Sequence, residues 1–344
     1  MEVGRGLAAL AVVFFHSNAS ADEYGGPYFQ WMATLEHGVD FFFVLSGFII
    51  LTAHRQDIGN RNAVWEYLMK RAIRLLPLLW LVVLGYAALR YFGGGTVYAE
   101  QIFRSLFPYP SLQPASPLVV WTLRHEIVFY LLFVTLIYAR KLGLWVFAVW
   151  SLAALIQLAL SMFGHAAGGI WSFLLSSYTL DFALGMFIAY LHGKKQFSAS
   201  IFPLLAGIGL LISSLLVMEY AGFGRLGEAD YISPAATAGT LLLGLIFALI
   251  LHGLLRLESR FTAPRFLVLL GSASYAIYLA HTPLNSILQR LVTYLPDQAI
   301  ALGGGHIFLI FFGVIGGFVI YFTYERPMGR YLRKKLVKKR LETG

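Results

Sequence analysis

Long apolar segments dominate this sequence and leave few architectures open to it. About ten runs of roughly 17–25 residues are apolar enough to cross a hydrocarbon layer about 30 Å thick as helices. They lie near residues 3–20, 38–54, 75–92, 117–139, 143–163, 171–192, 201–219, 235–256, 267–292 and 305–324. We therefore predict an all-α fold, a polytopic membrane helix bundle with about ten transmembrane helices, in one domain over residues 1–344.

The composition also indicates an integral membrane protein. Of the 344 residues, 58% are hydrophobic and 12% are charged, whereas a soluble domain has about 25% charged residues. In a soluble protein the net charge of +9 would suggest a nucleic-acid partner. Here most basic residues lie in short loops and in the C-terminal tail, so they indicate membrane orientation instead. Because the chain has no cysteine, disulfides, thiolate metal sites and a cysteine nucleophile are excluded.

The charge of the connections alternates along the chain and predicts the orientation. Basic residues gather at 55–74, 140–141, 194–195 and 256–265 and in the tail at 330–340, whereas the connections between them are mainly acidic. Basic loops stay in the cytoplasm. We therefore expect both termini to be cytoplasmic, with a short basic cytoplasmic C-terminal tail.

Ionisable residues occur within several of the apolar segments. Arg5 and His16 are 11 positions apart, which is about three helical turns. On one helix, Arg5 then lies near one membrane face and His16 in the middle or far half of the bilayer. An ionisable residue at that depth is expensive and indicates a functional site.

Two arginines follow one another at i, i+3 spacing before the third apolar segment. Residues 65–77 are typical of an interfacial amphipathic helix, with Arg71 and Arg74 on one face. Two neighbouring guanidinium groups at the cytoplasmic surface form a clamp for phosphate. The residues alone indicate a phosphate ligand and anionic lipid headgroups equally well.

The fourth segment carries Trp121 and, three positions further on, the run from Arg124 to Glu126. Three ionisable residues near a helix entrance are unusual for packing alone. Trp121 and Tyr130 are each typical of the aromatic belt at a membrane interface. We expect Arg124 to pair with Glu126 or Asp40, because buried charges rarely stay unpaired.

Other polar residues in the spans have both a structural and a functional interpretation. Tyr275, Tyr278 and His281 follow at i, i+3 steps and can touch along one side of a helix. Structural hydrogen bonding between tyrosine and histidine is the role we favour for His281, and its alternative is an intramembrane base in place of His16. For Asp181 we favour pairing with an arginine over lining a substrate cavity.

Taken together, these features resemble acyltransferase family 3, the bacterial integral-membrane acyltransferases that O-acetylate surface polysaccharides. The resemblance spans nearly the whole chain, in Arg5…His16, the string 38–48 with Asp40, Arg71-x-x-Arg74 before Pro77, Trp121-Thr-Leu-x-x-Glu126, Ser274-Tyr-x-x-Tyr-Leu-x-His281 and Tyr324-Glu-Arg-Pro327. It implies transfer of an acetyl or other short acyl group from acyl-CoA to a hydroxyl of a glycan or lipid-linked sugar. The expected location is the bilayer of the bacterial inner membrane, with neither a metal nor a nucleic-acid partner.

The resemblance also implies roles for individual residues. A hydroxyl is a poor nucleophile at neutral pH and needs a positioned base, for which histidine is the usual choice. We predict His16 as that base or as a transient acyl carrier, with Glu126 near it at the outer half of the membrane. Arg71 and Arg74 are predicted to bind the phosphates of acetyl-CoA, and Arg5 either to hold phosphate or to polarise the carbonyl.

Five further residues are predicted to contact the substrate, namely Asp40, Trp121, Tyr130, Tyr278 and His281. Glu325 and Arg326 are expected to form a terminal ion pair at the cytoplasmic face. A competing class is a transporter or flippase of a lipid-linked sugar, which also places histidine and acidic residues in its spans. Many transporters have a matching pair of broken helices in the two halves of the chain, and such a pair is not evident in this sequence.

The predicted orientation can be tested by cysteine labelling, because the chain has no cysteine of its own. Ser20→Cys should react with a membrane-impermeant maleimide in intact cells, and Asn60→Cys should react only after lysis. Labelling of Asn60→Cys from outside would invert the protein and place the predicted phosphate clamp away from cytoplasmic acetyl-CoA.

Overall fold

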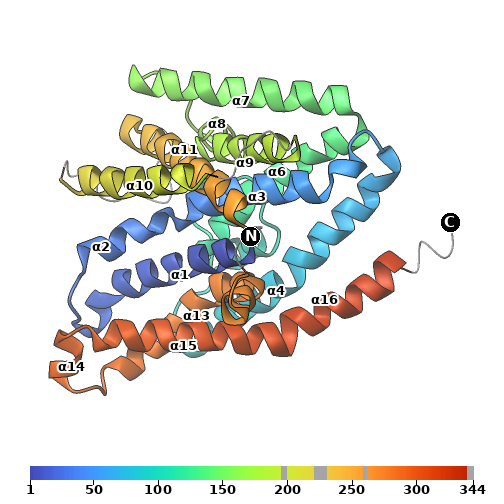
Figure 1. Ribbon diagram of the computed structural model, residues 1–344. Helices are drawn as coiled ribbons and strands as arrows, with labels where there is room; N and C mark the ends of the chain where they lie inside the picture. Colours follow the sequence, from blue (N-terminus) through green and yellow to red (C-terminus); the bar gives the residue numbers. More distant parts are fainter. Residues whose placement is uncertain (195–199, 221–230, 259–261, 339–344) are drawn as a thin grey trace.

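The computed structural model describes residues 1–194, 200–220, 231–258 and 262–338 and is predominantly helical in this part, with no β-strand in it. The predicted basic residues Lys195, Arg260, Lys339 and Arg340 lie outside the described residues. The helices, shown in Figure 1, are α1 Glu2–Ala19, α2 Gln30–Ala33, α3 Gly38–Ala53, α4 Val64–Phe92, α5 Ala99–Leu106, α6 Trp121–Tyr138, α7 Arg140–Met162, α8 Ile170–Leu174, α9 Tyr178–Gly193, α10 Phe202–Tyr220, α11 Pro234–Leu257, α12 Arg265–Ser272, α13 Ser274–Val292, α14 Asp297–Ala301, α15 Gly304–Ile320 and α16 Arg326–Leu332.

The all-α prediction is confirmed for the described residues, and each predicted apolar segment is largely helical. Seven helical stretches are long and apolar enough to cross a membrane, or eight if the pair α12 and α13, bent by 65°, is one span. Helix α10 is too short in its described apolar part, and α1 is not among the seven because it carries Glu2, Arg5 and His16 within 18 residues. The chain is a multi-pass membrane protein, while the count of ten and the orientation stay predictions.

Residues 65–77 are helical, as predicted, but the helix does not end at Pro77. They are the first part of α4, which is 29 residues long and continues through Pro77. Tyr67, Ile73 and Leu75 are buried whereas Trp65 is exposed, so this part of α4 packs one face against the bundle. Arg71 and Arg74 therefore stand on the same helix as the third predicted span.

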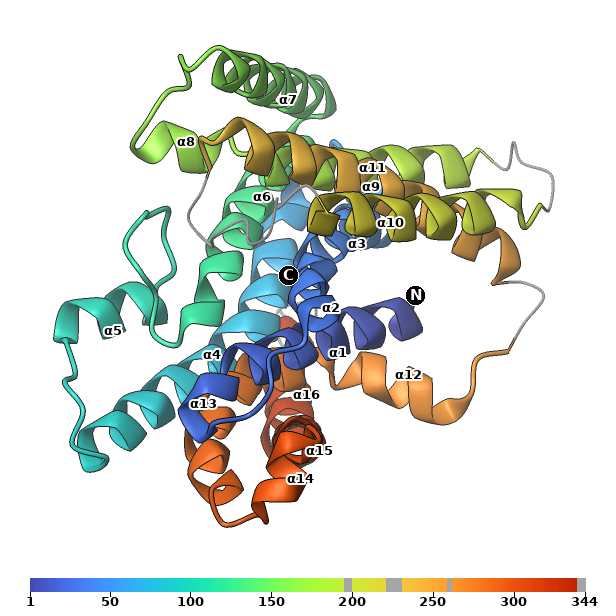
Figure 2. The same ribbon diagram turned by 90° about the vertical axis from the view of Figure 1, so that its left-hand side faces the viewer.

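Helix α1 lies near the centre of the bundle, where it packs against α3, α12, α13 and α15. Helices α9 and α11 cover α3 on one side, with α10 packed against α11 and α7 outermost beside α6 and α9. Helices α13, α15 and α16 lie on the other side of α1, next to α4 (Figures 1 and 2). The polar residues of α1 therefore face protein on several sides.

Glycines allow α3 and α9 to approach each other closely. A Cβ atom built at Gly47 would overlap the carbonyl oxygen of Phe182, and one built at Gly185 would overlap the carbonyl oxygen of Val44. Small residues at such contacts let two helix backbones meet. This contact fixes the position of α3, which carries Asp40 and the apolar residues of the cavity described below.

Enlarging this contact should destabilise the bundle. Gly47→Ala is expected to lower stability by about 1–3 kcal/mol, because the added methyl group forces the two backbones apart. The measurement is the midpoint of unfolding in a titration with SDS. Gly85→Ala in α4 is the matched control, since a Cβ there meets nothing within 4 Å, and it should be neutral or slightly stabilising. Equal midpoints for the two variants would contradict the close contact.

Candidate active site

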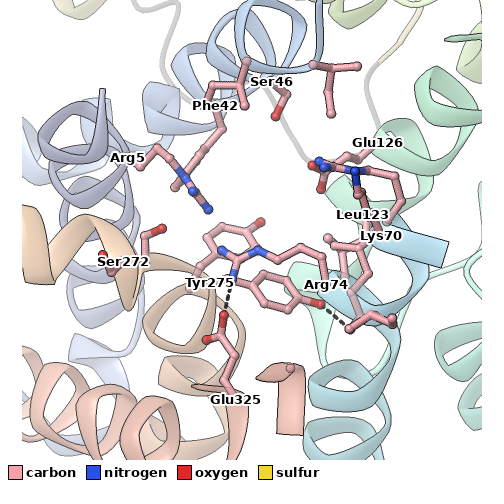
Figure 3. A pocket seen from close by; sticks show the side chains of 18 of the residues that line it. Arg5, Phe42, Ser46, Lys70, Arg74, Leu123, Glu126, Ser272, Tyr275 and Glu325 are labelled. Carbon is pink, nitrogen blue, oxygen red and sulfur yellow. Dashed lines mark hydrogen bonds and ion pairs between the residues drawn. The ribbon is translucent and has the colours of Figure 1, made fainter. Parts of the chain in front are cut away.

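A cavity of about 580 Å³ lies between α1, α3, α4, α6, α13 and the segment 321–333. Seven basic side chains line it, against three carboxylates. The basic residues are Arg5, Lys70, Arg71, Arg74, Arg326, Arg330 and Arg333, and the carboxylates are Glu2, Glu126 and Glu325. Figure 3 shows Arg5 from α1 and Arg74 from α4 reaching into the same space. The excess of positive charge makes this large cavity suited to a ligand with several negative charges.

The rest of the large cavity is mainly apolar and aromatic. Its lining follows α3 from Val39 to Ile50, a rise of about 16 Å along the helix. Phe42, Phe43 and Leu123 contribute to this wall. The large cavity therefore combines a set of charged side chains with an apolar wall along α3.

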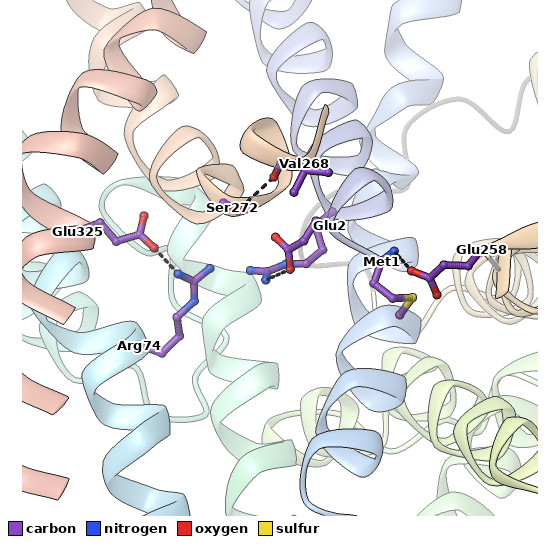
Figure 4. A network of polar contacts seen from close by, with 8 residues as sticks. Met1, Glu2, Arg74, Glu258, Val268, Ser272 and Glu325 are labelled. Atoms are coloured by element: carbon purple, nitrogen blue, oxygen red, sulfur yellow. Dashed lines mark hydrogen bonds and ion pairs between the residues drawn. The ribbon is translucent and has the colours of Figure 1, made fainter. Parts of the chain in front are cut away.

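Arg74 and Glu325 form an ion pair in the wall of the large cavity (Figures 3 and 4). The Glu325 side chain is 8% exposed, and the Arg74 guanidinium also lies 5.2 Å from the centre of the Tyr275 ring. The predicted ion pair of Glu325 with Arg326 is therefore wrong: Arg326 lies over the ring of Phe322 instead. Because Glu325 is mostly buried, its charge needs a partner, and α4 supplies one.

Arg71 and Glu126 line the large cavity on its other side. The Arg71 guanidinium lies over the rings of Tyr67 and Tyr130, at 6.0 and 5.7 Å, and Glu126 accepts a hydrogen bond from the Tyr130 hydroxyl. We expected Glu126 near His16, but it lines the basic cavity instead. Only the start of α6, at Trp121, lies near His16. Glu126 is five residues further along the helix, which is more than one helical turn.

Arg5 also lines the large cavity, near the start of α1. Its guanidinium lies 3.5 Å from the Glu2 carboxylate, and the Arg5 side chain is 24% exposed. Figure 4 shows Glu2 in the same view as the Arg74–Glu325 pair. Arg5 is therefore partly neutralised yet still in reach of a ligand in the cavity.

A second, small cavity of about 30 Å³ contains His16. Its lining residues are Val12, Phe15, His16, Glu36, His37, Val39, Asp40, Trp121, Tyr178 and Tyr278. Val39 and Tyr278 line both cavities, and we call these two residues the partition. The Tyr278 hydroxyl lies 2.8 Å from the Thr122 hydroxyl and donates to the carbonyl oxygen of Val119 at 3.2 Å.

The two cavities follow one another along the bundle. Three helices carry residues of each cavity in a consistent order, with Arg5 before His16 on α1, Asp40 before Ser46 on α3, and Trp121 before Glu126 on α6. On α1 the residue of the large cavity comes first along the chain, whereas on α3 and α6 it comes last. Helix α1 therefore runs past the two cavities in the direction opposite to that of α3 and α6. The sequence predicted this separation for Arg5 and His16 only.

His16 meets His281 at the end of the small cavity. The Nδ1 atom of His16 lies 3.2 Å from the Nε2 atom of His281, and their ring centres are 4.9 Å apart. The rings of Tyr278 and His281 contact each other, with centres 6.1 Å apart, while the Tyr278 hydroxyl bonds to Thr122 and to the carbonyl oxygen of Val119. His281 is completely buried and is not among the residues that line either cavity.

Asp40 has a partner that the sequence analysis missed. Nδ1 of His37 lies 3.3 Å from a carboxylate oxygen of Asp40, and the i, i+3 spacing of this pair was the signal that could have revealed it. Arg124, the partner we had considered for Asp40 and Glu126, instead donates hydrogen bonds to the carbonyl oxygens of Ser111 and Gln113. A loop folded over the end of α6 thus satisfies Nη1 of this buried guanidinium, whereas Nε and Nη2 have no hydrogen-bond partner among the described residues.

Asp181 does not pair with an arginine within the described part of the chain. Its side chain is completely buried, and neither carboxylate oxygen has a hydrogen-bond partner there. It packs against Gly244 of α11, where a Cβ atom would overlap its carboxylate. The described residues also contain no group of three or more histidine or acidic side chains arranged to hold a metal ion.

Comparison with known proteins gives two matches along most of the chain. Residues 1–325 match a family model described as an acyltransferase domain. The Exopolysaccharide production protein ExoZ of Rhizobium meliloti (strain 1021) is 30% identical over 324 residues, which cover 87% of this chain and 91% of that protein. No solved structure matches the chain.

Proposed function

Since the chain belongs to acyltransferase family 3, we propose that it transfers an acetyl or other short acyl group from acyl-CoA to a hydroxyl of an exported polysaccharide. The name of the Rhizobium relative supports an exopolysaccharide, or its lipid-linked precursor, as the acceptor. The observation that supports acyl-CoA as the donor is the basic cavity, which follows α3 to the partition. His16 lies on the other side of the partition. The proposed location is the bacterial inner membrane, with the basic cavity open to the cytoplasm.

The large cavity matches the chemistry of coenzyme A in both of its parts. The nucleotide with its phosphates would bind at the mouth, where Lys70, Arg71 and Arg330 provide positive charge. The uncharged pantetheine arm would follow the apolar wall along α3 and bring the thioester to the partition. Arg71 is the principal phosphate ligand in this proposal, because Arg74 already pairs with Glu325.

The small cavity suits the reacting hydroxyl. Its volume of about 30 Å³ holds about one water-sized group, so a single hydroxyl fits beside His16. His16 takes the proton of that hydroxyl while the oxygen attacks the thioester carbonyl carbon. The tetrahedral intermediate then breaks its carbon–sulfur bond, and His16 returns the proton to the leaving thiolate. Asp40 and Trp121 line the same cavity and are in place to contact the acceptor.

Removing the Arg71 guanidinium should weaken donor binding. Arg71→Ala is expected to weaken acetyl-CoA binding by about 1.5–3 kcal/mol, or roughly 10–150-fold in Kd, through loss of charge-assisted hydrogen bonds. The measurement is isothermal titration of the purified protein in lipid nanodiscs. Arg61→Ala is the matched control, because Arg61 precedes α4 and does not line the cavity. If wild type fails to bind acetyl-CoA, the transporter class becomes the better interpretation.

Removing the base should stop transfer and spare donor binding. His16→Ala is expected to lower transfer about 10²–10⁴-fold, the usual contribution of a general base, with the Kd for acetyl-CoA near that of wild type. Mass spectrometry of the surface polysaccharide, from a deletion strain complemented with each variant, measures the acylation. Wild-type acylation with His16→Ala would overturn the assignment of the base.

A further inference from the structure

Two buried histidines from different helices meet next to the small cavity, and each ring also contacts its own helix. The Nδ1 atom of His16 lies 3.0 Å from the carbonyl oxygen of Val12, and the Nδ1 atom of His281 lies 3.2 Å from the carbonyl oxygen of Ile277. In both cases the carbonyl belongs to the residue four positions earlier on α1 or α13. The Nε2 atom of His281 then lies 3.2 Å from Nδ1 of His16.

These contacts agree with one tautomer for each ring. A carbonyl oxygen only accepts hydrogen bonds, so Nδ1 carries the proton in both histidines. In a neutral imidazole the other nitrogen is then an acceptor. His281 therefore presents the lone pair of its Nε2 atom to the Nδ1–H group of His16. The carbonyl oxygen of Val12 accepts from the same N–H group. The basic lone pair of His16 is consequently on its own Nε2 atom.

We propose that His281 is a positioning residue for His16, an inference that rests on the proposed role of His16 as the base. Together with the carbonyl oxygen of Val12, His281 holds the His16 ring in the tautomer whose Nε2 atom can take a proton from the acceptor hydroxyl. When Nε2 of His16 takes that proton, its Nδ1–H becomes a stronger donor, and Nε2 of His281 faces it. A base oriented by a third group in this way is a common arrangement in nucleophilic catalysis.

The neutrality of His281 suits a proton that must be returned. A carboxylate in its place would hold the imidazolium of His16 by charge attraction, and this attraction is strong where water is excluded. An imidazole acceptor orients the ring and gives a weaker hold on the charge. His16 can then release the proton to the thiolate that leaves in the same reaction cycle.

The tautomer can be measured without any activity, by ¹⁵N NMR of protein labelled at histidine in nanodiscs. In wild type, Nδ1 of His16 should give the shift of a protonated nitrogen and Nε2 that of an unprotonated one, with His16→Asn identifying the signals. In His281→Leu only the carbonyl oxygen of Val12 remains to accept from Nδ1–H of His16, so a measurable part of the His16 population should shift to the other tautomer. His306→Leu is the matched control, because His306 is a buried histidine that contacts Tyr24 elsewhere in the bundle. It should leave the His16 signals unchanged.

The kinetic test separates positioning from a structural role. His281→Leu should lower kcat about 10–100-fold, the range seen when the partner behind a functional histidine is removed, while KM for acetyl-CoA stays unchanged. His281→Gln, whose side-chain carbonyl can accept from Nδ1–H of His16, should recover most of the rate. The assay uses acetyl-CoA and polysaccharide extracted from the deletion strain.

The outcomes distinguish this inference from the proposed function. Unchanged His16 signals in His281→Leu, or a rate loss that His281→Gln does not recover although it folds as wild type does, would overturn the positioning role. Wild-type transfer by His16→Ala would instead overturn the proposed base, and the NMR signals would still report the tautomer. If His281→Leu does not fold, the test is the comparison of His281→Gln with wild type. A hydrogen-bond acceptor at this position should preserve both the His16 tautomer and the rate, and a loss of either in folded His281→Gln would overturn the positioning role.

Discussion

The high free energy of a charge in hydrocarbon governs how this bundle is arranged. The charged groups of the described spans are brought together where another group or a cavity can solvate them. Arg74 pairs with the buried Glu325 in the wall of the large cavity, and one guanidinium nitrogen of Arg124 donates to the carbonyl groups of a loop. Asp181 differs from these groups, since neither of its carboxylate oxygens has a hydrogen-bond partner among the described residues.

Much of the fold could be predicted from the sequence, because apolar runs determine where helices form in a membrane protein. The helix predicted at residues 65–77 is present, but its continuation through Pro77 as part of α4 was not predicted, because the burial of Tyr67 and Ile73 is known only from the structure. Local spacing also indicated several residues of the two cavities, among them Arg5 and Tyr278. Partners far apart in the chain could not be predicted, because spacing along one helix gives no information on which other helix it faces. Arg74 and Glu325 are such a pair, separated by 251 positions.

The two cavities differ in size and in lining, and this difference matches the two substrates proposed for them. The large cavity is basic and long, as a charged and extended donor requires, whereas the small cavity accommodates little more than one polar group. The close contact between α3 and α9 holds the shared wall in place, since Val39 lies on α3. Binding and chemistry are thereby assigned to different parts of the same few helices.

The partition has a consequence for the energy supply of the cell. A membrane protein with solvent-filled spaces on both sides of its centre is a potential leak for protons. Val39 offers no hydrogen bond to water, and the Tyr278 hydroxyl is already engaged by Thr122 and by the carbonyl oxygen of Val119. Both residues therefore oppose a continuous chain of water molecules between the two cavities. In the proposed function, such a wall would let groups from two compartments react while limiting the passage of protons between them.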